Sequence, residues 1–216
     1  MSEMHQHNFA VRQLDREFNS HFNSLFINKY SFLCDTEDAV DLHGVDGVKN
    51  GFIAYMTAWL SNIDRLMSMV IASNMAFDSS SYHLIDLGGG KSISTIYLSH
   101  MYEFKSITSV DIHPQLLEDG KRNLDEYCRM EGKSLCIDFV CQDIREYLIG
   151  EGKYVFFAFN PFEWQVFERF IKNNYEVLKG SDSLLLYAND RCINELLNFS
   201  TLLARDEYYN LSVVNF

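Results

Sequence analysis

The stretch His83–Lys91 reads HLIDLGGGK and is followed by SISTIYLSH over residues 92–100. Its apolar first half is typical of a buried strand, and apolar residues recur at helical spacing after it. Between them stand Gly88, Gly89 and Gly90, which permit positive φ angles and close approach of a ligand to the main chain. The stretch therefore predicts a strand, a glycine turn and a helix, as in a nucleotide-type cofactor site. A tight turn that binds nothing is the alternative.

Strand and helix patterns alternate along the rest of the chain. We expect strands over 82–87, 106–111, 135–141, 154–159 and 183–189. The helices between them are expected over 92–102, 114–131, 163–178 and 192–197, with a helical turn at 145–148. Residues 198–216 have room for an antiparallel hairpin that turns near Arg205 and Asp206. This alternation predicts an α/β fold: a Rossmann-like, doubly wound, mostly parallel sheet of seven strands with a terminal antiparallel hairpin.

The first 80 residues have a different pattern. Apolar residues recur every three to four positions from Phe9 to Tyr30, which predicts an amphipathic helix. Residues 31–50 are expected to form an acidic, glycine-punctuated loop, and a second helix is expected from about Val48 to Met75. Its apolar stripe assigns Tyr55 and Trp59 to the core, with a place in the acceptor pocket as the alternative. We therefore divide the chain into an N-terminal helical extension or lid, residues 1–80, and a main domain, residues 81–216.

Composition excludes several classes of protein. The 216 residues include 30 acidic and 18 basic residues, a net charge of −12, and no basic stripe, so we do not expect a nucleic-acid partner. The five cysteines have neither a C-x-x-C pair nor a metal-ligand spacing, so we expect reduced thiols and no metal site. The chain begins without a signal-peptide pattern and has no apolar run long enough for a membrane span, so we expect a cytoplasmic protein without a membrane partner.

Polar residues stand at the carboxyl ends of four successive predicted strands. Asp86 and the glycines end the first, Asp111 the second, Asp143 the third and Asn160 the fourth. Because the carboxyl ends of parallel strands meet at one edge of a sheet, these residues should surround one site.

In order and spacing, these segments resemble those of class I S-adenosylmethionine-dependent methyltransferases. The likeness runs from about residue 82 to the end, and it is strongest to a small bacterial type with D-L-G-x-G-K and N-P-F segments and a G-V-D loop, here Gly44–Asp46. Ser92 stands where the last glycine of the usual pattern would be. The resemblance implies S-adenosylmethionine as cofactor. The cofactor-binding residues that it implies are Asp86, Gly88, Gly89, Gly90, Asp111, Ile112, Asp143 and Ile144.

Specific roles follow from the resemblance. Asp86 would hold the cofactor's ammonium, Asp111 would accept from both ribose hydroxyls, and Asp143 with the backbone of Ile144 would meet the adenine. An alternative role for Asp143, compatible with the first, is a helix N-cap.

Asn160, Pro161 and Phe162 resemble part of the D/N-P-P-Y/F segment of amino-directed methyltransferases, with one proline instead of two. There the side-chain oxygen and a backbone carbonyl accept hydrogens of the nitrogen, and the aromatic ring stacks on the substrate. These three are therefore the candidate catalytic residues, and the acceptor would be a nitrogen on a small molecule or a protein side chain. A strand-ending turn with a core phenylalanine is the alternative.

Three other functions remain open at this stage. A dinucleotide site is the weaker interpretation because Ile93 occupies the position of the third glycine in G-x-G-x-x-G. An oxygen-directed methyltransferase would need a base, for which His43 in the loop with Asp41 and Asp46 is a candidate. A cofactor-binding module without catalysis would serve regulation or assembly. The terminal strand pair and the aromatic N-terminal helices are candidate surfaces for a homodimer.

Overall fold

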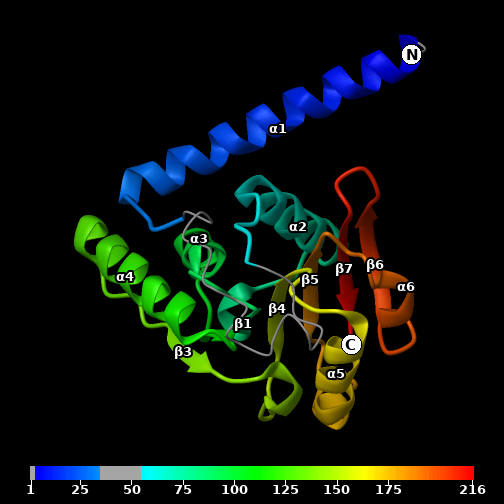
Figure 1. Ribbon diagram of the computed structural model, residues 1–216. Helices are drawn as coiled ribbons and strands as arrows, with labels where there is room; N and C mark the ends of the chain where they lie inside the picture. The colour runs from blue at the N-terminus through cyan, green and yellow to red at the C-terminus, as the bar shows by residue number, and fades with distance from the viewer. Residues whose placement is uncertain (1–2, 35–54) are drawn as a thin grey trace.

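A seven-stranded sheet forms the centre of the protein, with helices on both faces (Figure 1). The computed structural model describes residues 3–34 and 55–216, with side chains from residue 12 on. The loop residues Asp41, His43 and Gly44–Asp46 therefore lie outside the described residues.

The strands follow the order β3-β2-β1-β4-β5-β7-β6 across the sheet. The first five are parallel to one another, and β7 lies antiparallel between β5 and β6. Their bounds are β1 His83–Leu87, β2 Ser106–Asp111, β3 Asp138–Cys141, β4 Tyr154–Phe159, β5 Leu184–Ala188, β6 Thr201–Asp206 and β7 Leu211–Asn215. This topology confirms the expected α/β fold with its parallel sheet and terminal hairpin.

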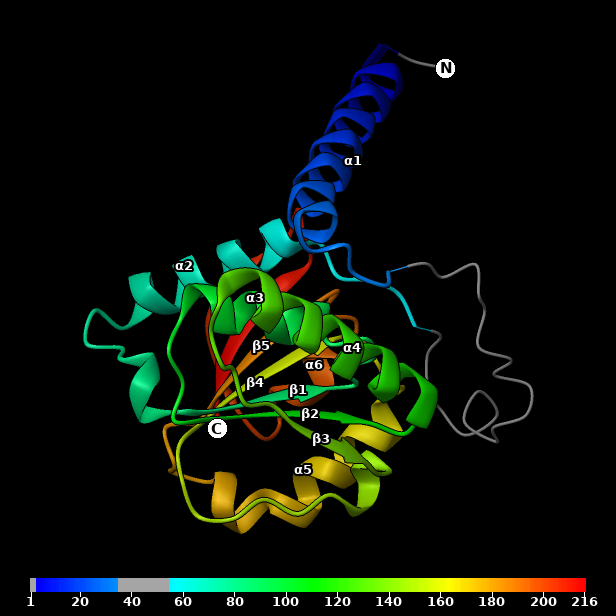
Figure 2. The same ribbon diagram turned by 90° about the vertical axis from the view of Figure 1, so that its left-hand side faces the viewer.

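Helices α2 Leu60–Ser73, α3 Ile93–Met101 and α4 Pro114–Glu131 cover one face of the sheet, and α5 Trp164–Leu178 and α6 Ile193–Leu196 cover the other. The short 3-10 turns are η3 Ser79–Ser81 and η4 Ile144–Glu146. Figure 2 shows the two helical layers edge-on. The central strand β4, YVFFAF, is buried on both faces up to Ala158, as its apolar sequence requires.

The C-terminal half of helix α1, Glu3–Tyr30, packs on the body, while the first turns of the helix extend away from it (Figures 1 and 2). The hydroxyl of Tyr209, in the turn between β6 and β7, donates to the Asp15 carboxylate of α1 at 3.3 Å. Tyr30 and the buried residues of α2 belong to the same apolar core as the sheet residues Leu84 and Val155. Helix α2 thus joins the layer that covers the sheet. The division at residue 80 stays a prediction.

The predicted helix from about Val48 to Met75 is wrong over residues 55–59, and residues 48–54 of it lie outside the described residues. Residues 55–59 are not helical, and α2 begins only at Leu60. The cause is a contact from α1: Asn23 Nδ2 donates to the carbonyl of Ala58 at 3.0 Å, and Asn23 Oδ1 accepts from the N–H of Leu60 at 2.8 Å. This side chain binds the extended backbone that leads into α2.

The predicted turn of the terminal hairpin is also misplaced. Strand β6 continues to Asp206, and the turn occupies residues 207–210. The carboxylate of Asp206 accepts from the N–H groups of Tyr208 and Tyr209 at 3.0 and 3.2 Å, and Asn210 takes a positive φ of 52°. Asp206 therefore starts the turn instead of lying within it.

Over residues 3–34 and 55–216, no helix combines the length and apolarity that a membrane span needs. The same part of the chain has no group of three or more His, Cys, Asp or Glu residues placed to hold a metal ion.

Candidate active site

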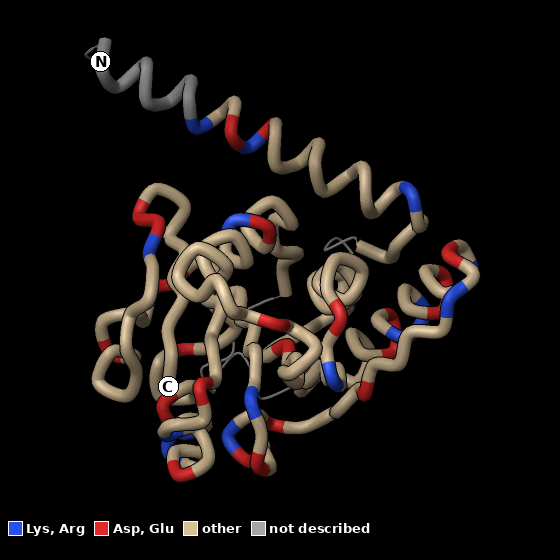
Figure 3. Tube along the Cα trace, turned by 180° about the vertical axis from the view of Figure 1, so that it is seen from behind, with Lys and Arg blue, Asp and Glu red and all other residues tan. Residues whose placement is uncertain are grey.

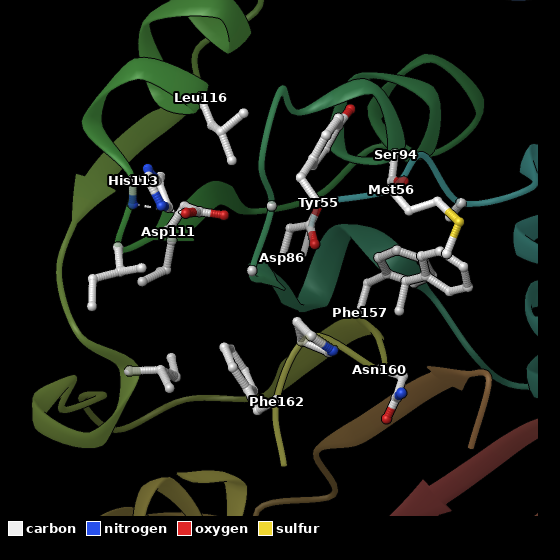
Figure 4. Close-up of a pocket in the computed structure, with 18 of the residues that line it drawn as sticks. Tyr55, Met56, Asp86, Ser94, Asp111, His113, Leu116, Phe157, Asn160 and Phe162 are labelled. Atoms are coloured by element: carbon white, nitrogen blue, oxygen red, sulfur yellow. Dashed lines mark hydrogen bonds between the residues drawn. The ribbon is translucent and has the colours of Figure 1, made fainter. Parts of the chain in front are cut away.

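A pocket opens where β1, β2, β4 and β5 end at the carboxyl edge of the sheet (Figure 4). Figure 4 shows Asp111 and Asn160 on opposite sides of it, with Asp86 between them. Further walls come from the extended segment before α2 and from the turn after β5. The lining residues include Tyr55, Met56, Thr57, Ala58, Asp86, Gly88, Gly89, Ser94, Asp111, Ile112, His113, Leu116, Gln142, Ile144, Phe157, Phe159, Asn160, Pro161, Phe162, Asn189 and Arg191.

The glycine turn is hydrogen-bonded to β2, and side chains pack closely around it. The N–H groups of Gly88 and Gly89 both donate to the carbonyl of Val110, at 2.9 and 3.0 Å. Gly88 and Gly90 have positive φ angles of 76° and 52°. A Cβ on Gly88 would lie 2.5 Å from Cβ of Pro161, and one on Gly90 would lie 2.3 Å from the ring of Tyr55. Both positions therefore require glycine for conformation and for space.

Ser92, which replaces the last glycine of the usual pattern, still takes the left-handed conformation, with φ 57°. It is fully buried at the N-terminus of α3, where its Oγ lies 2.8 Å from Oγ of Ser109. A Cβ on Gly89 would lie 2.1 Å from this same Ser109 oxygen. Ser109 therefore packs against Gly89 of the turn and hydrogen-bonds Ser92, the residue that departs from the pattern.

Asp111 presents a fixed carboxylate to the pocket. One oxygen accepts from the N–H of Gly90 at 2.9 Å, and the other accepts from the N–H of His113 at 2.8 Å. Burial raises the pKa of Asp111, and these two backbone bonds oppose that rise. Each oxygen can accept a further hydrogen bond, so the carboxylate is oriented for a donor pair such as a ribose diol.

Asp86 lies deeper, at 2% exposure, and accepts from the hydroxyl of Thr95 at 2.6 Å. Burial raises the pKa of Asp86 to about 7, and the nearby charge of Asp111 adds to the effect. A cation in the pocket would favour the ionised form of Asp86. The sequence does not mark Thr95 as a site residue, because no motif includes it. It comes beside the Asp86 carboxylate only when the first turn of α3 forms.

Asp143 caps η4: its carboxylate accepts from the N–H of Arg145 at 2.9 Å and forms an ion pair with that guanidinium. The helix-capping interpretation is confirmed in this form. Its two neighbours, Gln142 and Ile144, line the pocket, whereas Asp143 is not one of the lining residues in the described chain. A direct contact of Asp143 with a cofactor stays a prediction.

Asn160 ends β4 with a positive φ of 40° and is 4% exposed. Its Oδ1 accepts from the hydroxyl of Tyr187 at 3.2 Å. Pro161 and Phe162 lie under the glycine turn, since both approach the position of a Gly88 Cβ. Phe162 also packs in the apolar core with Phe167, so it is both a core residue and a lining residue.

Tyr55, assigned to a helical core by its spacing, lines the pocket instead. Its hydroxyl lies 3.2 Å from Oγ1 of Thr57, and burial raises its pKa. We call residues 55–58 the strap. Sequence reasoning missed the strap because the Asn23 contacts that hold it extended join residues 35 and 37 positions apart. Asn189 and Arg191 were missed as well, since no motif marks the turn after β5.

No known family profile and no curated protein sequence matches the chain. Among solved structures, it is similar to the ribosomal protein L11 methylase of Lactobacillus delbrueckii subsp. bulgaricus, with a TM-score of 0.51, 13% identity, and coverage of 70% of this chain and 75% of that chain. The chain has the Rossmann-like fold of this methylase.

Two other solved structures align less closely. Magnesium protoporphyrin IX methyltransferase from Synechocystis, solved with bound S-adenosylmethionine, has a TM-score of 0.49 and 11% identity over 84% of this chain and 96% of that chain. An rRNA methylase from Streptococcus thermophilus has a TM-score of 0.46 and 13% identity over 68% of this chain and 92% of that chain. At 13% identity, the likeness to the ribosomal protein L11 methylase shows the fold alone.

Proposed function

We propose that this protein is an S-adenosylmethionine-dependent methyltransferase that methylates a nitrogen atom on a small molecule or a protein side chain. The observation that carries the proposal is the pairing of a glycine cradle with the oriented Asp111 carboxylate at one end of the pocket, and a buried Asn160 at the other. The first end suits a nucleoside cofactor, and the second suits an acceptor with N–H groups.

The residues present fit this cofactor. Gly88 and Gly90 hold the turn in left-handed conformations, at positions where any Cβ would collide with Pro161 or Tyr55, and Gly88 lines the pocket with Gly89. Asp86 is a buried carboxylate that an ammonium group would favour in its ionised form. Asp111 can accept from two ribose hydroxyls, with Ile112 beside it in the pocket wall.

The adenine would lie toward η4. There Ile144 supplies an apolar wall and Asp143 holds the start of the turn through its cap. Gln142, a third residue of this segment, adds a polar side chain to the same wall.

When bound, S-adenosylmethionine supplies a methyl group on a positively charged sulfur. What the chain itself supplies is position and exclusion of water, which can account for much of the acceleration of a displacement reaction. In this proposal, Asn160 Oδ1 accepts a hydrogen of the acceptor nitrogen and so aims the lone pair of that nitrogen. Asn160 needs no covalent step for this role.

The charge distribution bears on the acceptor. Figure 3 shows basic and acidic residues interspersed along the described chain, as on α4. With a net charge of −12, such a surface gives little attraction to a phosphate backbone, which supports a small molecule or a protein as acceptor.

An oxygen-directed reaction would need a base at the acceptor end. His43 lies outside the described residues. His113 lines the pocket, but at the cofactor end, where its backbone N–H donates to the Asp111 carboxylate. Among the described residues nothing else favours that alternative.

The test measures both cofactor binding and methyl transfer. The protein should bind S-adenosylmethionine in a calorimeter and add one methyl group, seen by mass spectrometry, to members of a panel of amines and peptides. Asn160→Ala should lower turnover and leave cofactor affinity nearly unchanged. Binding without transfer to any acceptor would favour a regulatory module, and unchanged turnover in Asn160→Ala would remove the basis for nitrogen specificity.

A further inference from the structure

Arg191 lies at the end of the pocket that the proposed cofactor contacts leave unused. It lines the pocket with Asn160 and Asn189, and its side chain is exposed. Within residues 3–34 and 55–216, the structure records neither an ion pair nor a side-chain hydrogen bond for its guanidinium. It is therefore a cation at a pocket wall whose charge no described acid neutralises.

The turn that carries Arg191 is held firmly. Asp190 is 2% exposed, and its carboxylate accepts from Nε of Arg205 at 2.9 Å and from the hydroxyl of Ser212. The N–H of Asp190 donates to the carbonyl of Asn210 at 3.1 Å. The acid adjacent to Arg191 is thus committed to another arginine, on β6, and cannot pair with Arg191.

The backbone on the other side of the turn is equally defined. Asn189 takes a left-handed φ of 54°, and the N–H of Arg191 donates to its carbonyl at 2.8 Å. Arg191 therefore belongs to a tight turn that hydrogen bonds hold in place, and not to a long loop.

The position of this turn in the sheet separates Arg191 from the nucleoside end. Strand β5 is next to β4, and β4 lies between it and β1, whereas Asp111 ends β2 on the other side of β1. The cation thus stands on the Asn160 side of the pocket, where an acceptor would bind.

Apolar side chains complete this side. Phe157 and Phe159 from β4 line the pocket, and so does Met56 of the strap. Figure 4 labels Met56, Phe157 and Asn160 among the residues that line the pocket. An apolar wall next to a guanidinium complements a molecule with a flat apolar body and an oxyanion, because arginine binds carboxylates and phosphates in a bidentate manner.

We propose that Arg191 binds a carboxylate or phosphate group carried by the methyl acceptor, which has an apolar, aromatic-sized body. That the bound molecule is the methyl acceptor rests on the proposed function. The oxyanion site itself does not, so the two can be tested apart.

The test uses three probes of one skeleton: benzoate, phenyl phosphate and the neutral benzyl alcohol. Their affinities are measured by ligand-observed NMR on the wild-type protein, on Arg191→Gln, on Arg191→Lys and on the control Arg169→Gln. Arg169 is an exposed arginine of α5 that does not line the pocket. Each series is run with and without S-adenosylhomocysteine, whose own affinity is measured by calorimetry.

We expect one of the two anions to bind at least about tenfold more tightly than benzyl alcohol to the wild type and to Arg169→Gln, as for a charge-assisted contact. Arg191→Gln should lose this preference and Arg191→Lys should keep part of it, while affinity for S-adenosylhomocysteine stays unchanged. The anion that binds more tightly identifies the oxyanion as carboxylate or phosphate.

Absence of anion binding, equal affinity for the neutral probe, or a preference that survives Arg191→Gln would overturn the proposal. So would a parallel loss of S-adenosylhomocysteine affinity in Arg191→Gln, because Arg191 would then hold the cofactor's carboxylate. If the anion preference depends on Arg191 but wild-type protein does not bind S-adenosylhomocysteine, the oxyanion site stands and the proposed function fails.

Discussion

The hydroxyl of Tyr187 on β5 donates to Oδ1 of Asn160 at the end of β4, at 3.2 Å. The same hydroxyl accepts from the N–H of Cys192 at 3.4 Å, and burial raises the pKa of Tyr187, so it stays a donor at neutral pH. Both side chains are buried. A neighbouring strand thus fixes the orientation of the amide to which we assign acceptor positioning.

Tyr187→Phe should therefore lower turnover about five- to tenfold, because one hydrogen bond of about 1 kcal/mol no longer orients Asn160. Cofactor affinity, measured by calorimetry, should not change. Tyr154→Phe is the matched control: its hydroxyl donates to the carbonyl of Gly150, at the opposite end of β4. Equal losses of turnover in both variants would show that Tyr187 acts only through stability.

Gly90→Ala should abolish cofactor binding. Its Cβ would lie 2.3 Å from the Tyr55 ring at a φ of +52°, so the strap or the turn must move. Gly132→Ala controls for backbone strain, because Gly132 has a φ of +62° and nothing within 4 Å of an added Cβ. We expect Gly132→Ala to lose about 1 kcal/mol of stability and no cofactor affinity. Calorimetry and denaturant unfolding separate the two effects, and unimpaired binding by Gly90→Ala would refute the cradle.

Asp86 should make stability depend on pH. Its pKa of about 7 in the folded chain lies above the ordinary value of 3.8. Between these values the folded chain holds a proton that the unfolded chain has lost, so the free energy of unfolding should fall as pH rises from about 4 to about 7. Urea unfolding across this range should show a weaker fall in Asp86→Asn. Part of the fall should persist, since burial also raises the pKa of Asp111. Identical slopes in the two proteins would show that the environment of Asp86 is misjudged.

Asn23 should control the strap from α1. Asn23→Ala leaves the carbonyl of Ala58 and the N–H of Leu60 without the amide that binds them. We expect a loss of about 1–3 kcal/mol of stability and weaker cofactor affinity, because the strap forms a wall of the pocket. Asn28→Ala, at an exposed site of the same helix, is the control and should change neither. Wild-type cofactor affinity in Asn23→Ala would show that cofactor binding does not depend on how Asn23 holds the strap.

Much of the fold could be predicted where local pattern and tertiary environment agree. The predicted bounds of β2, α4 and β4 coincide with the structure, because β4 is apolar on both faces and α4 has proline at its first position and glycine after its end. The carboxyl-edge residues Asp86, Asp111 and Asn160 converge as expected from parallel strands.

What sequence could not supply depends on contacts between distant residues. The spacing of Tyr55 and Trp59 fits a helix, but Asn23 holds that backbone extended. Arg191 carries no motif, and its place at the pocket depends on the β5 turn that Asp190 and Arg205 fasten. Such contacts are decided by packing and leave no local pattern to read.

The most direct test of the central proposal is a calorimetric titration of S-adenosylmethionine into the wild type, Asp111→Asn and the control Asp138→Asn, an exposed acid on the edge strand β3. We expect one cofactor per chain for the wild type and for Asp138→Asn. Asp111→Asn should bind at least about tenfold more weakly, because the oriented carboxylate has lost its charge. A wild-type protein that does not bind, or an Asp111→Asn protein that binds equally well, would contradict the assignment of this pocket.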